Sequence, residues 1–446
     1  MTSPDSQASP PFQSIADFRA HTLAHTELLT WCNAQAARLN PDLNALREHQ
    51  PGNAATGGGP LRGVPMTVKD NIGVTGFETW AGSSAPLPET WTRSGELITR
   101  LAAAGAVVTS KSHCAEFAFG GSGYNPHHGT PKNPWDRHIH RAPGGSSSGT
   151  AVAVATGMAW FGIGTDTGGS VRVPASLCGC VGFRPSHGHW PTDGIVPLST
   201  LFDDPGVITR NATDLSLVAA AIDRVNPLAP PALDTLRFAT LPTPFLSVCE
   251  ADIAANWARA KLQLEQRGVR FCNASARVVA DGFEMLDEGP NTAAVSVARL
   301  IEHELPAWGM NLGPHVRRLI ESHRDIEDSV VESRHARVMA FRHQIDALFA
   351  KADFLVLPTC PVGAPAVAML SSDKYYERYS NALLRLTVLP SLFGCGALTL
   401  PMGFDSQGIP VGLQLVARPG DDQRLVACAR AVESALEDFA PILDRF

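Results

Sequence analysis

The 446-residue sequence lacks the features that define several large classes of protein. It has no long hydrophobic run, because its apolar stretches are short and interrupted by glycine, and this argues against a membrane-spanning helix. It has no excess of basic residues either: 36 Lys and Arg stand against 43 Asp and Glu, for a formal net charge of −7. No basic patch or arm therefore predicts nucleic-acid binding. The N-terminus lacks a charged segment followed by an apolar one, so nothing there predicts secretion.

The nine cysteines are an odd number and lack the regular spacing of a disulfide framework. We therefore expect a reduced, cytoplasmic protein. Cys178 and Cys180 could form a redox pair, but we expect them to pack as small side chains against the core.

Two pairs of histidines, His127-His128 and His138-x-His140, suggest a metal site. They lie in a stretch rich in proline and glycine, without a carboxylate at helical spacing. We therefore expect solvated loop positions and no bound metal.

The order of hydrophobic patterns predicts an α/β protein, because strand patterns alternate with helix patterns as in a largely parallel or mixed sheet. We expect two short helices within 14–39, a strand within 63–71, a helix over 96–104, a strand over 106–110, helices over 214–222 and 251–266, and strands over 236–240 and 269–271. Residues 183–208 are expected to form loops and turns, 281–348 to be mostly helical, and 1–13 to be a disordered tail.

Two Gly-Gly-Ser units, ending at Ser146 and Ser170, flank an apolar segment over 151–163. Glycine before serine indicates a backbone held where a Cβ would clash or block a ligand. Consecutive N–H groups beside the second serine can point into one space, as an oxyanion hole requires. Alone, such a unit is more often a structural turn. A phosphate-binding loop is disfavoured, because no Gly-Lys-Ser/Thr follows.

A lysine occupies a short β-rich run over 63–71, at Lys69. Taken alone, it would be a surface lysine at a strand end. Buried in an apolar strand it would lose its proton readily, and a neutral lysine can activate a serine.

Together these residues resemble the amidase signature hydrolases, and the resemblance covers nearly the whole chain. It rests on Lys69, on Gly-Gly-Ser-Ser with Ser146, and on Gly-Thr-Asp-Thr-Gly-Gly-Ser ending at Ser170, with both serines at the family's spacing. The resemblance implies that Ser170 is the nucleophile, that Ser146 follows a cis peptide bond and relays the proton, and that Lys69 is the general base. The expected oxyanion hole comprises the N–H groups of Thr167, Gly168, Gly169 and Ser170.

The same resemblance implies an α/β amidase signature fold, a large mixed β-sheet core covered by helices on both faces. We expect one domain over 14–446, with a catalytic core over 60–225 and a variable helical lid over 281–348. Asp166 and Arg172 flank the second serine, and we expect a structural ion pair rather than substrate contacts. Val173 stands where some members carry a carboxylate-binding arginine, and Ser148 where glycine is commoner.

The predicted function is hydrolysis of a small-molecule carboxylic amide to an acid and ammonia or an amine, through an acyl-enzyme and without a cofactor. Neither nucleic acid nor a membrane is an expected partner, and a homodimer is left open. One alternative is the glutamine-hydrolysing subunit of a tRNA-dependent amidotransferase. Another is a non-catalytic relative used for binding, which would be expected to have lost Lys69 or one of the serines.

Overall fold

The computed structural model describes residues 12–20, 26–52, 58–436, 439 and 442–445. Most of the tail expected over 1–13 lies outside the described residues. Within it, Phe12 is buried and meets Phe18 edge-on, with ring centroids 5.2 Å apart.

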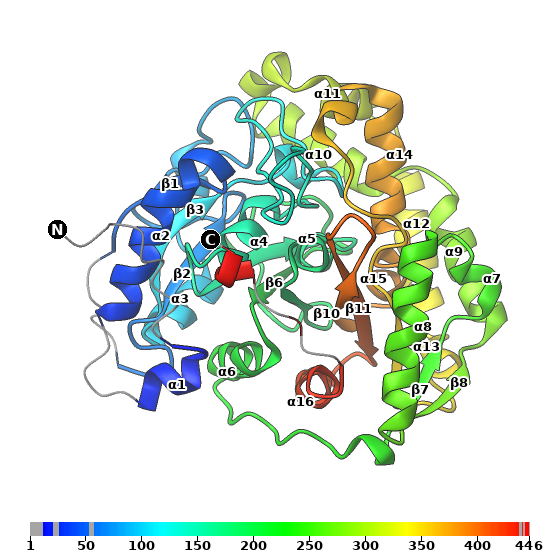
Figure 1. The fold of residues 1–446 in the computed structure, drawn as a ribbon. Helices are drawn as coiled ribbons and strands as arrows, with labels where there is room; N and C mark the ends of the chain where they lie inside the picture. Colours follow the sequence, from blue (N-terminus) through cyan, green and yellow to red (C-terminus); the bar gives the residue numbers. More distant parts are fainter. Residues whose placement is uncertain (1–11, 21–25, 53–57, 437–438, 440–441, 446) are drawn as a thin grey trace.

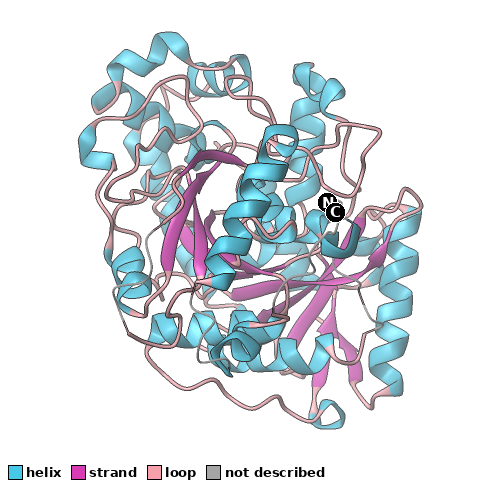
Figure 2. Ribbon diagram, turned by 60° about the vertical axis from the view of Figure 1, so that its left-hand side comes forward, coloured by secondary structure: helices cyan, strands magenta, loops and turns pink. Residues whose placement is uncertain are grey.

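A single mixed sheet of eleven strands runs through the described part of the chain (Figures 1 and 2). Its spatial order is β1-β3-β2-β4-β6-β5-β10-β11-β9-β7-β8. Parallel pairs join β3, β2 and β4 near one edge and β9, β7 and β8 at the other, and the pairs between them are antiparallel. The strands are β1 (Leu46–His49), β2 (Pro65–Lys69), β3 (Val107–Ser112), β4 (Phe161–Asp166), β5 (Val181–Arg184), β6 (Asp204–Thr209), β7 (Arg237–Thr240), β8 (Arg270–Asn273), β9 (Phe354–Pro358), β10 (Gly396–Phe404) and β11 (Pro410–Ala417).

Helices lie on both sides of the twisted sheet (Figure 2). They are α1 (Ile15–Ala20), α2 (Glu27–Leu43), α3 (Glu96–Ala103), α4 (Ser148–Ala155), α5 (Arg172–Cys178), α6 (Ala212–Asp223), α7 (Thr243–Leu246), α8 (Ala251–Gln266), α9 (Ala276–Asp287), α10 (Thr292–His303), α11 (Pro314–Glu321), α12 (Asp328–Arg342), α13 (Ile345–Leu348), α14 (Asp373–Leu384), α15 (Val388–Leu392) and α16 (Asp422–Glu433). Short 3₁₀ turns are η1 (Glu89–Trp91), η2 (Glu116–Ala118), η3 (Leu233–Thr235), η4 (Pro306–Asn311), η5 (Val367–Ser371) and η6 (Ile442–Arg445).

The central strands are buried on both faces. Neighbouring residues of a strand point to opposite sides, and Val207 and Ile208 of β6 accordingly join two different apolar clusters. One cluster packs α1, α3, α6, α8 and α16 on one face, and the other packs α4 and α5 on the opposite face. The fold is therefore the large mixed α/β sheet covered on both faces that the sequence predicts.

Local chemistry explains where several helices begin. Asn211 caps α6, because its side chain accepts a hydrogen bond from the N–H of Asp214 at 2.7 Å. Asn291 caps α10 in the same way, through the N–H groups of Ala293 and Ala294. The α8 boundaries match the predicted helix over 251–266, whereas α2 continues through Pro41 to Leu43, beyond the predicted end of the first helical region.

The expectation of loops and turns over 183–208 is wrong at both ends, because Phe183 and Arg184 belong to β5 and the last residues belong to β6. Residues Asp204–Thr209 form β6, a fully buried strand between β4 and β5. The segment reads Asp-Pro-Gly-Val-Ile-Thr, and its first three residues are typical of turns rather than strands. Pairing with strands on both sides outweighs these local preferences.

A glycine in the first turn of α4 allows that helix to lie against the backbone of the first strands. Gly149 N–H donates to His113 O at 2.9 Å, and a Cβ on Gly149 would clash with Ala45 O and lie 2.6 Å from His113 N. Both are backbone atoms, which cannot rotate away as the end of a side chain can. This close approach fixes α4, and with it the loop that carries Ser146.

We predict that Gly149→Ala lowers the free energy of unfolding by about 3 kcal/mol, because the added methyl group overpacks rigid backbone. Urea denaturation monitored by circular dichroism measures the change. Gly58→Ala is the matched control, because nothing lies within 4 Å of the added Cβ. Equal stabilities of the two variants would contradict the close packing of α4.

Candidate active site

Lys69 lies at the end of β2, fully buried in the sheet. Its Nζ is 2.8 Å from Ser146 Oγ, 2.6 Å from Thr165 Oγ1 and 3.4 Å from the carbonyl oxygen of Thr165. Burial lowers the pKa of Lys69 to about 8, against the opposing attraction of Cys114, Asp166 and Asp203. At pH 7 about one tenth of this amine is therefore uncharged, far more than for an ordinary lysine.

The two Gly-Gly-Ser units lie against each other. The N–H of Ser147 donates to the carbonyl oxygen of Ser170 at 3.1 Å, which joins the loop before α4 to the turn before α5. The Gly145–Ser146 peptide bond is cis. Ser146 is fully buried, whereas Ser170 lines a cavity. The structure thus brings Lys69 to Ser146 and places the second serine segment beside the first.

A buried ion pair holds the turn that carries Ser170. The Arg172 guanidinium binds Asp166 in a bidentate manner, with Nε–Oδ2 and Nη2–Oδ1 distances of 2.9 and 2.8 Å, and neither side chain is exposed. Burial alone would raise the pKa of the Asp166 carboxyl, but the charge and hydrogen bonds of Arg172, with Arg184, hold it below its ordinary value. The remaining Arg172 donors reach Thr387 O at 2.9 Å, Gln414 Oε1 at 2.6 Å and Ser391 Oγ at 3.0 Å.

The residues expected to form the oxyanion hole, Thr167 to Ser170, span the turn between β4 and α5. Two side-chain contacts brace this turn. Thr167 Oγ1 donates to Asp203 Oδ1 at 2.6 Å, and Thr387 Oγ1 donates to the carbonyl oxygen of Gly168 at 2.6 Å. The turn is therefore held from two sides, by the residue before β6 and by the residue before α15.

Two polar residues around Lys69 were not predicted as part of the site. Thr165 contacts the amine directly, and Asn71 Nδ2 donates to Thr165 Oγ1 at 3.1 Å. Asn71 follows Lys69 by two residues, a spacing that places side chains on one face of an extended segment and could have identified it. Thr165 belongs to the Gly-Thr-Asp-Thr motif, but nothing in the sequence shows that it faces the lysine.

The four histidines considered as metal ligands divide into a half-buried pair and an exposed pair. His127 and His128 are half-buried rather than solvated, which corrects that expectation: their Nε2 atoms lie 2.7 Å from Glu116 Oε1 and from Ser83 O. His138 and His140 are exposed. Within the described ranges, no group of three His, Cys, Asp or Glu side chains could hold a metal ion. Cys178 and Cys180 are buried in the apolar cluster of α4 and α5 and are not disulfide-bonded.

A cavity of about 480 Å³ opens at Ser170. One wall contains Thr167, Gly168 and Ser170, and residues of α9, α10, α12, α14 and α15 form the remainder, with Phe119 and Phe202 adding aromatic surface. Parts of the segment expected to form a lid, 281–348, therefore border this cavity, at 286–293 and at Arg334 and Val338.

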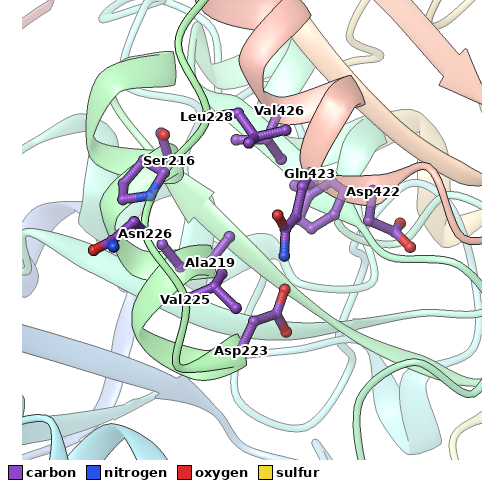
Figure 3. Close-up of a pocket in the computed structure, with 12 residues that line it drawn as sticks. Ser216, Ala219, Asp223, Val225, Asn226, Leu228, Asp422, Gln423 and Val426 are labelled. Carbon is purple, nitrogen blue, oxygen red and sulfur yellow. The ribbon is translucent and has the colours of Figure 1, made fainter.

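A second cavity, between α6 and α16, is unrelated to these residues. Figure 3 shows the side chains of Ser216, Asp223 and Gln423 around it. Its volume of about 20 Å³ is close to that of one water molecule, and it contains none of the predicted site residues. The cavity at Ser170, by contrast, is large enough to admit an organic substrate.

Comparison with known proteins places the chain in a family. The amidase family pattern matches residues 24–426. The 2-amino-5-chloromuconic acid deaminase of Comamonas testosteroni is 35% identical over 441 residues, covering 95% of each chain. One subunit of the glutamyl-tRNA(Gln) amidotransferase of Moorella thermoacetica is 32% identical, covering 85% of this chain and 84% of its own. A crystal structure of an amidase superposes with a TM-score of 0.84 at 29% identity, covering 95% of this chain and 98% of its own.

The chain belongs to the amidase family and is an enzyme that acts on carbon–nitrogen bonds. The solved relatives share the large mixed sheet, so the amidase signature fold predicted from the sequence is confirmed. Over the described part of the chain, no helix combines the length and apolar character needed to cross a membrane.

We predict that Arg172→Met destabilises the protein by about 3–5 kcal/mol, because it leaves the Asp166 carboxylate buried without its charge partner. Thermal and urea unfolding measure the loss. Arg337→Gln is the control: Arg337 pairs with Glu288 at the surface, and removal of an exposed pair changes stability by about 1 kcal/mol or less. An Arg172 variant as stable as this control would contradict the bracing role of the buried pair.

Proposed function

We propose that the enzyme hydrolyses a small-molecule carboxylic amide to an acid and ammonia or an amine, with Ser170 as nucleophile, Ser146 as proton relay and Lys69 as general base. The observation that carries the proposal is the 2.8 Å contact between the buried Lys69 amine and Ser146 Oγ. The next residue, Ser147, donates a backbone hydrogen bond to Ser170, so the two serines lie in neighbouring segments. A lysine with its pKa lowered to about 8 can accept a proton at physiological pH.

The reaction begins with two proton transfers. Neutral Lys69 takes the proton of Ser146, which takes that of Ser170, and Ser170 Oγ attacks the amide carbon. Backbone N–H groups of Thr167 to Ser170 stabilise the negative charge on the carbonyl oxygen. The proton returns along the same relay to the departing nitrogen. Water, activated in the same manner, then releases the acid from the Ser170 ester.

The size of the site and the relatives support a small substrate. A volume of about 480 Å³ suits a small organic molecule. The deaminase that matches the chain over 95% of both lengths acts, by its name, on an amino-substituted acid. We infer that this enzyme likewise releases ammonia from a compound that carries a carboxyl group.

A second candidate is the glutamine-hydrolysing subunit of a tRNA-dependent amidotransferase, which the 32% identity to such subunits favours. Ser170 would perform the same chemistry, but the ammonia would pass to a partner. Affinity purification from the native organism distinguishes the two: a stoichiometric partner, required for ammonia release from glutamine, would establish the amidotransferase.

We predict that Ser170→Ala abolishes ammonia release from amides and leaves the unfolding midpoint close to that of the wild type. A fluorophosphonate probe should label the wild type at Ser170, as located by mass spectrometry of peptides, and should spare the variant. Ser84→Ala changes an exposed serine and serves as the control for labelling. Labelling that persists at another serine in Ser170→Ala would refute the assignment.

We predict that activity rises with pH through a single ionisation near 8. Because burial lowers the pKa of Lys69 to about 8, the amine is charged below that pH and inactive as a base, and neutral above it. Lys69→Ala should remove this dependence and nearly all activity. Lys69→Arg should be equally inactive, because a guanidinium does not lose its proton in this range.

Initial rates between pH 5.5 and 10 test this dependence on Lys69, with Lys132→Arg as a control at a partly exposed lysine that pairs with Asp42. Substantial activity of Lys69→Arg with an unchanged pH profile would mean that Lys69 only positions Ser146, and the relay would have to be abandoned.

A further inference from the structure

The cavity at Ser170 contains one cation that lacks a charge partner within the cavity wall. The charged residues that line it are Asp287, Arg334 and Arg385. Arg385 is neutralised by Asp287, with Nη1–Oδ1 and Nη2–Oδ2 distances of 2.5 and 3.0 Å. The charged side chains of the cavity lining therefore carry a net positive charge, which comes from Arg334.

The Arg334 guanidinium is held in place but not satisfied. Its Nη2 donates to the carbonyl oxygen of Met285 at 2.7 Å, which connects α12 to α9. Its Nη1 is buried and has no hydrogen-bond acceptor among the described residues. A buried charged donor without an acceptor is costly, so the guanidinium of this cavity-lining residue is incompletely satisfied and would gain from an anion bound beside it. Burial and the neighbouring Arg337 also lower the pKa of Arg334, a penalty that a bound anion would relieve.

The helix dipole next to Arg334 also favours an anion. The cavity is lined by Asn291, Thr292 and Ala293 at the positive N-terminal end of the twelve-residue helix α10, where the Asn291 side chain already accepts from the N–H groups of Ala293 and Ala294. A Cβ on Gly289 would lie 3.1 Å from Arg334 Nη1, so the glycine lets the chain pack closely against the guanidinium. The rest of the lining is largely apolar, with Leu286 and Val338 near the arginine in sequence.

We propose that Arg334 binds a carboxylate of the substrate, so that the enzyme prefers amides whose acyl part carries a second, free carboxyl group. This inference rests on the proposed function, because it assigns the substrate class of the Ser170 site. The carboxylate pairs with the Arg334 guanidinium in the cavity wall, while the amide carbon lies at Ser170. The cation comes from α12, whereas Val173, in α5 after Ser170, offers no charge.

The test compares two amides of equal chain length. Adipamate carries a carboxylate at the far end, and hexanamide carries none. We expect the wild type to prefer adipamate, and Arg334→Gln to lower kcat/KM for adipamate by about 10- to 100-fold, mainly through KM, since it removes a charge-assisted hydrogen bond. The same variant should leave hexanamide within about twofold of the wild type.

Two further variants separate binding from structure. Arg334→Lys retains the charge and should recover part of the adipamate activity. Arg277→Gln changes an exposed arginine of α9 that does not line this cavity, and should leave both substrates unaffected. Equal losses on adipamate and hexanamide in Arg334→Gln would show that Arg334 supports the fold of the site only, and would overturn the proposal.

A measurement without turnover keeps this inference separate from the proposed reaction. Calorimetric titration of Ser170→Ala with adipamate should show binding that is lost in Ser170→Ala/Arg334→Gln. If adipamate binds in this way but the wild type hydrolyses neither amide, the carboxylate site is supported and the amide reaction is refuted. Hydrolysis of adipamate without any effect of Arg334→Gln, or no binding of adipamate to Ser170→Ala, would refute the carboxylate site.

Discussion

The buried pair of Asp166 and Arg172 is the interaction on which the rest of the site depends. Two charges removed from water are costly, and this pair offsets the cost with two mutual hydrogen bonds and with further acceptors for the guanidinium. Asp166 ends β4 and Arg172 begins α5, so the pair closes the turn that presents Ser170. Because Arg172 also reaches Gln414 of β11, the position of that turn is set by the far half of the sheet.

The same pair also influences the basicity of the site. Asp166 is one of the groups whose negative charge raises the pKa of Lys69, in opposition to burial. An unpaired Asp166 would raise it further and keep the amine protonated. Since Arg172 compensates the carboxylate at 2.8 Å, burial remains the dominant influence and the pKa falls to about 8. The ion pair thus serves both the geometry of Ser170 and the neutral state of Lys69.

The fold class could be predicted from the sequence because hydrophobic periodicity and turn residues reflect local physics, and α8 was predicted with the bounds observed. Strand β6 could not, since Asp204, Pro205 and Gly206 enter a strand only through pairing on both sides. In the site, the motifs indicated Lys69 and Ser146, and the Lys69 amine lies within hydrogen-bond distance of the Ser146 hydroxyl. The contribution of partners distant in sequence, such as Thr387 beneath the Ser170 turn, depends on tertiary packing that no local pattern records.

Lys69 and Arg334 differ in whether they can lose a proton near neutral pH, and the surroundings of each side chain suit this difference. Lys69 is an amine, which burial can convert to a neutral base, and its Nζ lies among hydroxyl and carbonyl oxygens. Arg334 is a guanidinium, which stays charged at physiological pH even where burial lowers its pKa, and its Nη1 has no acceptor among the described residues. An arginine in place of Lys69 could not accept the serine proton, and a buried lysine in place of Arg334 would be prone to lose the charge that attracts an anion. The identity of each side chain therefore supports its proposed role, in catalysis for Lys69 and in substrate selection for Arg334.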